Sequence, residues 1–251
     1  MNIYVLSASR ADAKLPTLYS LLNSNRADDV RLVVQKSQAE EYATRHPEAT
    51  LTILPAGIDR ISPTRQWVVE NCDSEKLVLF DDDLVFAGLG EDGKTFKGEH
   101  VVDGMLDMLD IALSTNMHAT VAPRNGCNRL KPDEDGFMYV GRSMRVLGYR
   151  REAFDRLGVR FDRIETKEDF DVTLQLLRLG YANAIVCKFI NGQGKSNAPG
   201  GCSVFRTKEM EERSSNALSV LHEPFVKVVE RSTKDGWFDG GKRVDVRLSG
   251  S

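Results

Sequence analysis

The sequence of 251 residues predicts an α/β fold: one domain, residues 1–251, with a mainly parallel central sheet and helices on both faces. Short apolar runs typical of buried strands alternate with helical patterns along its first half. Hydrophobic residues make up 41% of the chain and charged residues 28%, as in ordinary globular proteins. The length suits one large domain with a substantial core.

In the first half, each predicted strand is followed by a polar loop and then by a helix. Ser62 before Pro63 is typical of an N-cap followed by a favourable first helical residue. Parallel strands joined in this way place ligands outside their carboxyl ends. Strands are expected at 3–6, 31–35, 51–57 and 76–80, and helices at 15–22, 38–46 and 61–72.

The second half is less regular. A loop rich in glycine and charge is expected at 88–100. Residues 190–203 hold four glycines and a proline, which favours a long loop that could act as a lid. Helices are expected at 101–113 and 168–181, and strands at 118–123, 137–141 and 183–189.

Composition excludes several classes of protein. The net charge of -3 argues against a protein that coats nucleic acid without specificity. No apolar run approaches the ~20 residues of a membrane helix, and the N-terminus lacks the layout of a signal peptide. We therefore expect a cytoplasmic protein with no membrane association. The four cysteines contain no C-x-x-C pair, so neither a zinc knuckle nor a disulfide framework is indicated.

Positive charge is concentrated in one segment. Residues 142–163 contain seven arginines against three acids, Glu152, Asp155 and Asp162. These arginines could contact the phosphates of a nucleic acid, or they could form a solvated surface paired with the three acids.

The stretch "VLFDDDLVF" places three aspartates at the end of a predicted strand. In extended backbone, Asp81 and Asp83 point to one side while Asp82 faces away. Two carboxylates at this edge suit Mg²⁺ or Mn²⁺. The alternative is a solvated turn, since acids are common in turns.

A second group of acids begins the predicted helix "EDFDVTLQLLRLGY". Glu168, Asp169 and Asp171 lie in its first turn, where acids generally complement the helix dipole. The functional interpretation is that one of these carboxylates faces the cleft and removes a proton from an acceptor hydroxyl.

Together, the strand-terminal D-x-D and the later "EDFDVTLQLLRLGY" resemble the nucleotide-sugar glycosyltransferases of the GT-A fold. The block "ISPTRQWVVE…FDDDL", with "NAPGGCSVFRT", is similar to the TET-associated glycosyltransferases of bacteriophages. The resemblance implies a GT-A-like domain that moves a sugar from a nucleotide sugar, such as a UDP-sugar, to 5-hydroxymethylcytosine in DNA. It further implies a half that binds donor and metal, 1–87, and a half that binds acceptor, 100–251.

The resemblance also assigns roles to residues. Asp81 and Asp83 would hold Mn²⁺ or Mg²⁺, and Asp169, or alternatively Glu168, would act as general base in an inverting displacement. His222 is a candidate third metal ligand, although no histidine clearly matches that role. The candidate contacts to the donor are Ser7, Ser9, Arg10, Arg65, Asp81 and Asp82.

Some residues have weaker assignments. Asn197, Gly200 and Gly201 could shape the acceptor or phosphate site. Trp67 is expected in core or rim packing, and Trp237 in similar packing or in stacking on a base.

Other functions remain open. The Q-x-x-R-W signature of processive synthases is absent, which favours transfer of a single sugar. The acceptor could instead be a glycan, lipid or protein. A sugar nucleotidyltransferase is disfavoured because "SASRADAK" stands where a G-x-G-T-R loop would be. A binding module with structural acids is a further alternative.

Overall fold

A computed structural model describes residues 1–193, 201, 205–233 and 241–248. Within these residues, ten strands form one sheet in the order β3-β2-β1-β4-β9-β7-β10-β5-β6, with β8 paired to β10. The strands of the first half are β1 (Asn2–Leu6), β2 (Val30–Val34), β3 (Leu51–Ile53), β4 (Lys76–Asp81), β5 (Leu84–Leu89) and β6 (Thr95–Phe96). The remaining strands of this sheet are β7 (His118–Pro123), β8 (Phe137–Tyr139), β9 (Val146–Arg150) and β10 (Ala184–Gln193).

The sheet is mainly parallel, as predicted. Strands β3, β2, β1 and β4 run in the same direction. Strand β9 runs antiparallel to both β4 and β7, and β10 is parallel to β7. Only β9, β5 and β8 therefore run against the other described strands of this sheet.

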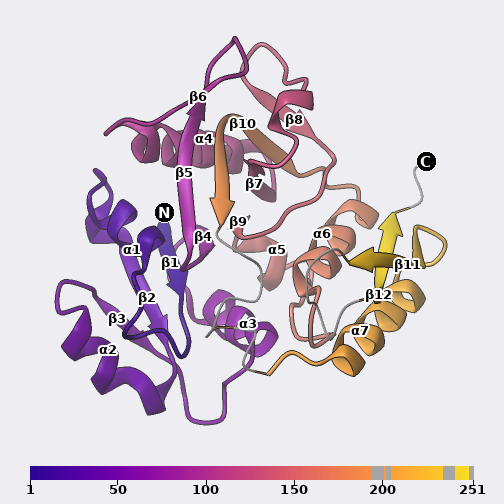
Figure 1. The fold of residues 1–251 in the computed structure, drawn as a ribbon, viewed down its shortest axis with the longest axis horizontal. Helices are drawn as coiled ribbons and strands as arrows, with labels where there is room; N and C mark the ends of the chain where they lie inside the picture. Colours follow the sequence, from indigo (N-terminus) through magenta and orange to yellow (C-terminus); the bar gives the residue numbers. More distant parts are fainter. Residues whose placement is uncertain (194–200, 202–204, 234–240, 249–251) are drawn as a thin grey trace.

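Helices cover both faces of the sheet (Figure 1). Alternation along β1 sends Ile3 and Val5 to one face and Tyr4 and Leu6 to the other. The first face packs against α1 (Pro16–Leu22), α2 (Ala39–Arg45) and α4 (Val101–Thr115). The second face packs against α3 (Ile61–Asn71), α5 (Glu152–Asp155) and α6 (Glu168–Arg178).

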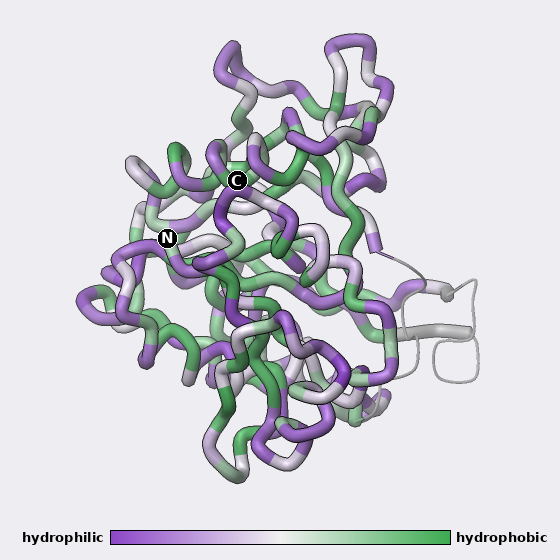
Figure 2. The backbone as a smooth tube through the Cα atoms, turned by 90° about the vertical axis from the view of Figure 1, so that its left-hand side faces the viewer, coloured by the Kyte–Doolittle hydropathy of each residue, from purple (hydrophilic) through white to green (hydrophobic). Residues whose placement is uncertain are grey.

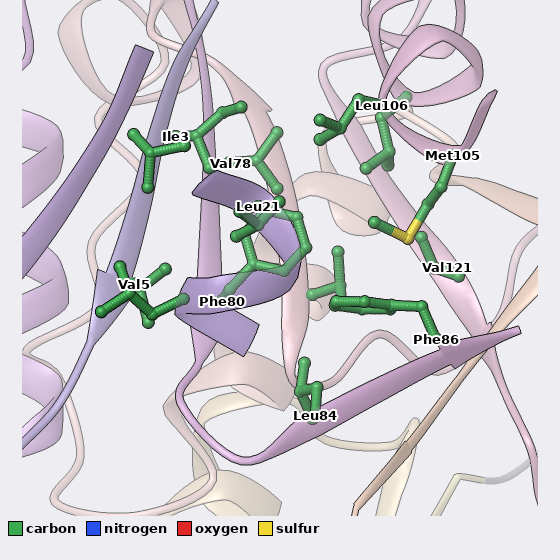
Figure 3. Packing of buried hydrophobic residues seen from close by; sticks show 14 of the residues in the cluster. Ile3, Val5, Leu21, Val78, Phe80, Leu84, Phe86, Met105, Leu106 and Val121 are labelled. Atoms are coloured by element: carbon green, nitrogen blue, oxygen red, sulfur yellow. The ribbon is translucent and has the colours of Figure 1, made fainter. Parts of the chain in front are cut away.

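Apolar side chains from distant segments meet on the first face. Figure 3 shows Phe80 of β4 and Phe86 of β5 beside Met105 of α4, and the two rings meet edge to face at a centroid distance of 5.9 Å. In Figure 2 the hydrophobic stretches of the chain run through the interior, with hydrophilic stretches around the periphery. This packing fixes the end of β4, and hence the three aspartates.

Three sequence predictions about local structure are wrong. The strand expected at 51–57 ends at Ile53. The helix begins at Ile61, as expected, but its N-cap is Arg60 and not Ser62. Ser62 lies in the first turn, where its hydroxyl hydrogen-bonds to the carbonyls of Ile164 and Glu165 at 2.7 and 3.0 Å. The loop predicted at 88–100 includes the end of β5 and all of β6.

In the second half, β9 and α5 occupy part of the arginine-rich segment, where no element was predicted. Strand β10 continues to Gln193, into the predicted loop 190–203.

Beyond the sheet, the chain adds helix α7 (Lys208–Leu221) and a two-stranded antiparallel sheet of β11 (Val226–Thr233) and β12 (Gly241–Leu248). We call this pair of strands the C-terminal ribbon. Figure 1 shows α7 and the ribbon beside α6. The apolar cluster between them contains Ile164, Phe170, Leu174, Leu218, Val226 and Val246.

Among the described residues, no helix has the length and apolar character needed to cross a membrane. Cys72, Cys127 and Cys187 are free thiols.

Candidate active site

The candidate site lies at the carboxyl ends of two neighbouring strands. Leu6 of β1 is paired with Asp81 of β4, so the loop after β1 and the aspartates after β4 lie side by side. Parallel strands bring their carboxyl ends to one edge of the sheet, which is where ligands of open α/β sheets bind.

The extended backbone ends at Asp81, and the chain turns at Asp82 and Asp83 before β5 begins. The side-chain alternation expected over these three aspartates is therefore absent. Asp82 is the buried one, 5% exposed, and it accepts hydrogen bonds from Ser7 Oγ and Arg10 Nη1, both at 2.5 Å. Arg10 Nη1 also lies 3.2 Å from Asp83 Oδ2. One guanidinium thus neutralises two of the three acids.

The loop after β1 is held by α2 and the turn before it. The hydroxyl of Tyr42 lies 2.7 Å from Ser7 Oγ and accepts from the backbone N–H of Arg10 at 3.0 Å. Gln38 contacts Ser9 twice, through the backbone N–H at 2.8 Å and the hydroxyl at 3.0 Å. Ser9 has a φ of 54°, an unusual value for a residue with a side chain. Sequence reasoning missed Tyr42 and Gln38, because nothing in a short amphipathic pattern identifies them as loop supports.

Arg65 of α3 connects the two acidic groups. It is 4% exposed, and it donates from Nη2 to Asp81 Oδ1 at 2.9 Å and from Nη1 to Glu168 Oε1 at 2.5 Å. The guanidinium fork is suited to holding two carboxylates at once. Arg65 therefore joins the end of β4 to the first residue of α6.

Burial and neighbouring charges raise the pKa values of two carboxylates at the site. Burial raises the pKa of Glu168 to about 7, opposed by the charge of Arg65 and reinforced by Asp169. Burial likewise raises the pKa of Asp81 to about 6, again opposed by Arg65, with Asp83, Asp82 and Asp169 raising it further. These carboxylates therefore lie near one another, and a bound cation would stabilise their charged forms.

Asp169 is partly exposed at the start of α6. Its Oδ1 accepts the backbone N–H of Phe170 at 2.8 Å, and its carbonyl accepts from the hydroxyl of Thr173 at 2.8 Å. The helix start therefore orients Asp169, whereas Glu168 is buried against Arg65.

His222 contacts a different carboxylate. Its Nε2 lies 2.6 Å from Oδ1 of Asp171, and both side chains are buried. Its buried Nδ1 has no hydrogen-bond partner among the described residues. In the part of the chain that the structure describes, no three His, Cys, Asp or Glu side chains gather as a metal site.

The remaining predicted residues fall into two groups. Gly201 lies at the candidate site: its N–H donates to the carbonyl of Ala8 at 2.8 Å, and it packs beside Arg10. Trp67 is partly buried against the core under α3. Asn197, Gly200 and Trp237 lie outside the described residues.

Many arginines of 142–163 are engaged within the protein. Arg142 packs over the ring of Phe170, 4.0 Å from its centroid. The ion pairs of this segment are Arg150–Glu152, Arg151–Asp155, Arg156–Glu152, Arg160–Asp162 and Arg163–Asp171, at 2.5 to 3.4 Å.

Two solved structures that bind nucleotide sugars share this fold. Residues 1–349 of S. aureus TarS, in complex with UDP-GlcNAc, match with a TM-score of 0.55 at 12% identity over 88% of this chain. The mannosyltransferase PcManGT from Pyrobaculum calidifontis, in complex with GDP-Man and Mn²⁺, matches with a TM-score of 0.50 at 15% identity over 73% of this chain. The chain spans 66% and 55% of these two structures, less than two thirds of their length.

Sequence comparison identifies the family. No curated protein matches the chain. The model of the TET-associated glycosyltransferase family matches residues 1–201, which include β1, the three aspartates and α6. The chain therefore has the GT-A fold of these structures, and it belongs to the TET-associated glycosyltransferase family.

Proposed function

We propose that the protein transfers a sugar from a nucleotide sugar to the hydroxyl of 5-hydroxymethylcytosine in DNA, with inversion at the anomeric carbon. The observation that carries the proposal is the Arg65 bridge, which brings the acids after β4 to the acids that begin α6. Donor activation and acceptor deprotonation need these two groups within one site.

The donor would bind at the loop after β1. Ser7, Ser9 and Arg10 lie beside the aspartates, and Tyr42 and Gln38 hold the loop in place. The complexes of TarS with UDP-GlcNAc and of PcManGT with GDP-Man support a nucleotide sugar as donor. A UDP-sugar is the first choice for assay.

A divalent cation would be held by Asp81 and Asp83. Their oxygens are hard ligands. The pKa of Asp81 is raised first by burial and further by Asp83, Asp82 and Asp169, whose combined negative charge a cation would relieve. When bound, Mn²⁺ or Mg²⁺ would neutralise the charge that develops on the leaving diphosphate. His222 is the proposed third ligand only if the site rearranges on binding, because it does not gather with Asp81 and Asp83 among the described residues. Its bond to Asp171 resembles the support that carboxylates give to metal-binding histidines.

Asp169 is the proposed general base. The carboxylate of Glu168 is engaged by Arg65, whereas Asp169 is partly exposed beside it. Asp169 would accept the proton of the acceptor hydroxyl as its oxygen attacks the anomeric carbon. The bond from that carbon to the diphosphate breaks in the same displacement, so the configuration inverts.

One assay tests the proposal. The purified chain is incubated with Mn²⁺ or Mg²⁺, a panel of nucleotide sugars, and DNA with or without 5-hydroxymethylcytosine. The DNA is then digested, and the masses of its nucleosides are measured by mass spectrometry. We expect a mass gain of one sugar on hydroxymethylcytosine alone, abolished in Asp83→Ala.

If no donor in the panel gives a mass gain, DNA is rejected as the acceptor. Donor consumption without modified DNA would point to a glycan, lipid or protein acceptor.

A further inference from the structure

The C-terminal ribbon lies beyond residues 1–201, which match the family. Strands β11 and β12 are paired from Val226↔Leu248 to Thr233↔Gly241, and neither pairs with the main sheet. Val226 and Val246 are buried in the cluster that includes Phe170 of α6 and Leu218 of α7. The ribbon is therefore attached through its inner face to the helix that carries Glu168 and Asp169.

The other face of the ribbon is basic. Lys227 stands directly opposite Arg247, and both are exposed. Four residues after Lys227, the side chain of Arg231 is 51% exposed and lies 3.3 Å from Asp245. Like charges opposite one another in a two-stranded sheet repel and destabilise it.

These cations differ from those of the arginine-rich segment 142–163. Among the described residues, neither Lys227 nor Arg247 forms an ion pair, whereas Arg156 and Arg160 each contact a carboxylate of their own segment. An anionic partner would remove the repulsion at the ribbon. It would gain much less at 142–163, where existing ion pairs would first have to break.

We propose that the basic face of the C-terminal ribbon binds the phosphate backbone of the DNA acceptor. This inference rests on the proposed function. Lys227 and Arg231 lie about 14 Å apart along an extended strand at ~3.4 Å per residue. That separation matches the rise of roughly four nucleotides at ~3.4 Å each.

Such a contact would position the DNA duplex relative to the active site. Contacts to phosphates fix the orientation of a duplex without reading its sequence. The ribbon packs on α7 and shares an apolar cluster with α6, so a duplex held there would have a fixed position relative to the first turn of α6. The target base would still have to leave the stack to reach Asp169.

The test measures binding of the full-length protein to a fluorescently labelled duplex that contains 5-hydroxymethylcytosine, by anisotropy from 50 to 200 mM salt. In the double variant Lys227→Gln/Arg247→Gln we expect affinity at 50 mM salt to fall roughly tenfold or more. The slope of log K against log salt should fall by about 1.8, since each lost phosphate contact removes about 0.9. The matched control is Arg156→Gln/Arg160→Gln, which should change affinity less than about twofold.

Donor binding, measured by calorimetry with UDP-GlcNAc, should be unchanged in the ribbon variant. Its melting temperature should be equal or higher, because the variant loses the repulsion between Lys227 and Arg247. Equal affinity and slope in the variant and the unaltered protein would overturn the inference, as would failure of the unaltered protein to bind duplex DNA while it binds the donor. A ribbon-dependent DNA complex that never gains sugar would instead reject the proposed function and leave the ribbon's role standing.

Discussion

Asp169 is the residue on which the proposed proton transfer depends. Replacement by Asn keeps the shape of the side chain but removes its basicity. We expect Asp169→Asn to lower kcat by roughly 10² to 10⁴-fold, the usual contribution of a general base, with little change in donor affinity.

Steady-state kinetics with calorimetry of the donor would separate these two effects. Glu91→Gln, at an exposed loop position, is the matched control and should leave kcat unchanged. A kcat for Asp169→Asn within twofold of the unaltered protein would exclude Asp169 as the base.

Glu168 makes stability depend on pH. Because its pKa is raised to about 7 by burial, the folded protein holds a proton that the unfolded chain releases near its ordinary value of 4.5. Between these values the folded state binds more protons, so its stability falls as pH rises. Asp81, with a pKa of about 6, acts in the same direction.

In Glu168→Gln the contribution of Glu168 is absent. We expect the free energy of unfolding of the variant, relative to the unaltered protein, to increase by about 2 kcal/mol from pH 5 to pH 8. Urea denaturation at the two pH values measures this change. Glu165→Gln, at an exposed carboxylate nearby, should show no such trend; the same trend in both variants would contradict the assignment to Glu168.

At the scale of single residues, the sequence predicted which residues belong to the site better than it predicted their contacts. Asp81, Asp82 and Arg10 could be selected because they follow predicted strands. The contact of Arg10 with these aspartates could not be predicted, because the alternation of side chains along the strand ends where the backbone turns at Asp82. The Arg65 bridge joins residues far apart in the chain, and no local pattern specifies such a contact.

At the scale of elements, α7 is tied to α6 by one buried polar contact. His222, the residue that follows α7, meets Asp171 in the first turn of α6. Removal of the imidazole leaves a buried carboxylate with fewer partners, since only Arg163 and Gln175 still contact it among the described residues. We expect His222→Ala to lower the free energy of unfolding by about 3 kcal/mol.

Chemical denaturation measures this loss, and Asn216→Ala on the exposed side of α7 is the control, with an expected change within about 0.5 kcal/mol. Mn²⁺ titration of the same two variants tests the proposed ligand role. If the Mn²⁺ affinities are equal, His222 serves only to join the helices.

Strand β5 shows why some elements were missed. Leu84 and Phe86 are buried while Val85 between them is exposed, which is a strand pattern. That pattern follows directly after three acids that suggested the end of regular structure. The turn at Asp82 and Asp83 occupies only two residues, so β4 and β5 could not be separated by a recognisable loop.

At the scale of the whole molecule, the segment from α7 onward covers apolar surface of α6. A chain that ends at residue 204 would expose Phe170 and Leu174, which now pack against Leu218 and Val226. We expect the truncated chain to lose on the order of 5 kcal/mol of stability, from ~1.5 to 3 kcal/mol for each side chain exposed. Thermal melting and binding of a hydrophobic dye measure the effect.

The control for truncation is full-length Phe225→Ser, which alters an exposed aromatic next to the ribbon without uncovering α6. A truncated chain that melts at the temperature of the full-length protein would show that this segment contributes no stability to the fold.

The fold class was predictable because β1 to β4 alternate with α1 to α3 in clear periodic patterns. Beyond β4, strands β9 and β5 run against their neighbours, and their order in the sheet depends on long-range pairing. Hydrophobic periodicity predicts which residues are buried. It does not predict the order of the strands in the sheet.

The guanidinium of Arg65 also couples the two acidic groups of the site. It divides its hydrogen bonds between Asp81 and Glu168, so any ligand that draws Asp81 away leaves Arg65 freer to stabilise the charge of Glu168. Coupling of this kind is reciprocal: protonation of Glu168 must in turn change how tightly Asp81 holds its ligand. Occupation of the donor side would thus change the pKa of Glu168 beside Asp169, and the protonation of Glu168 would change donor affinity by the same factor.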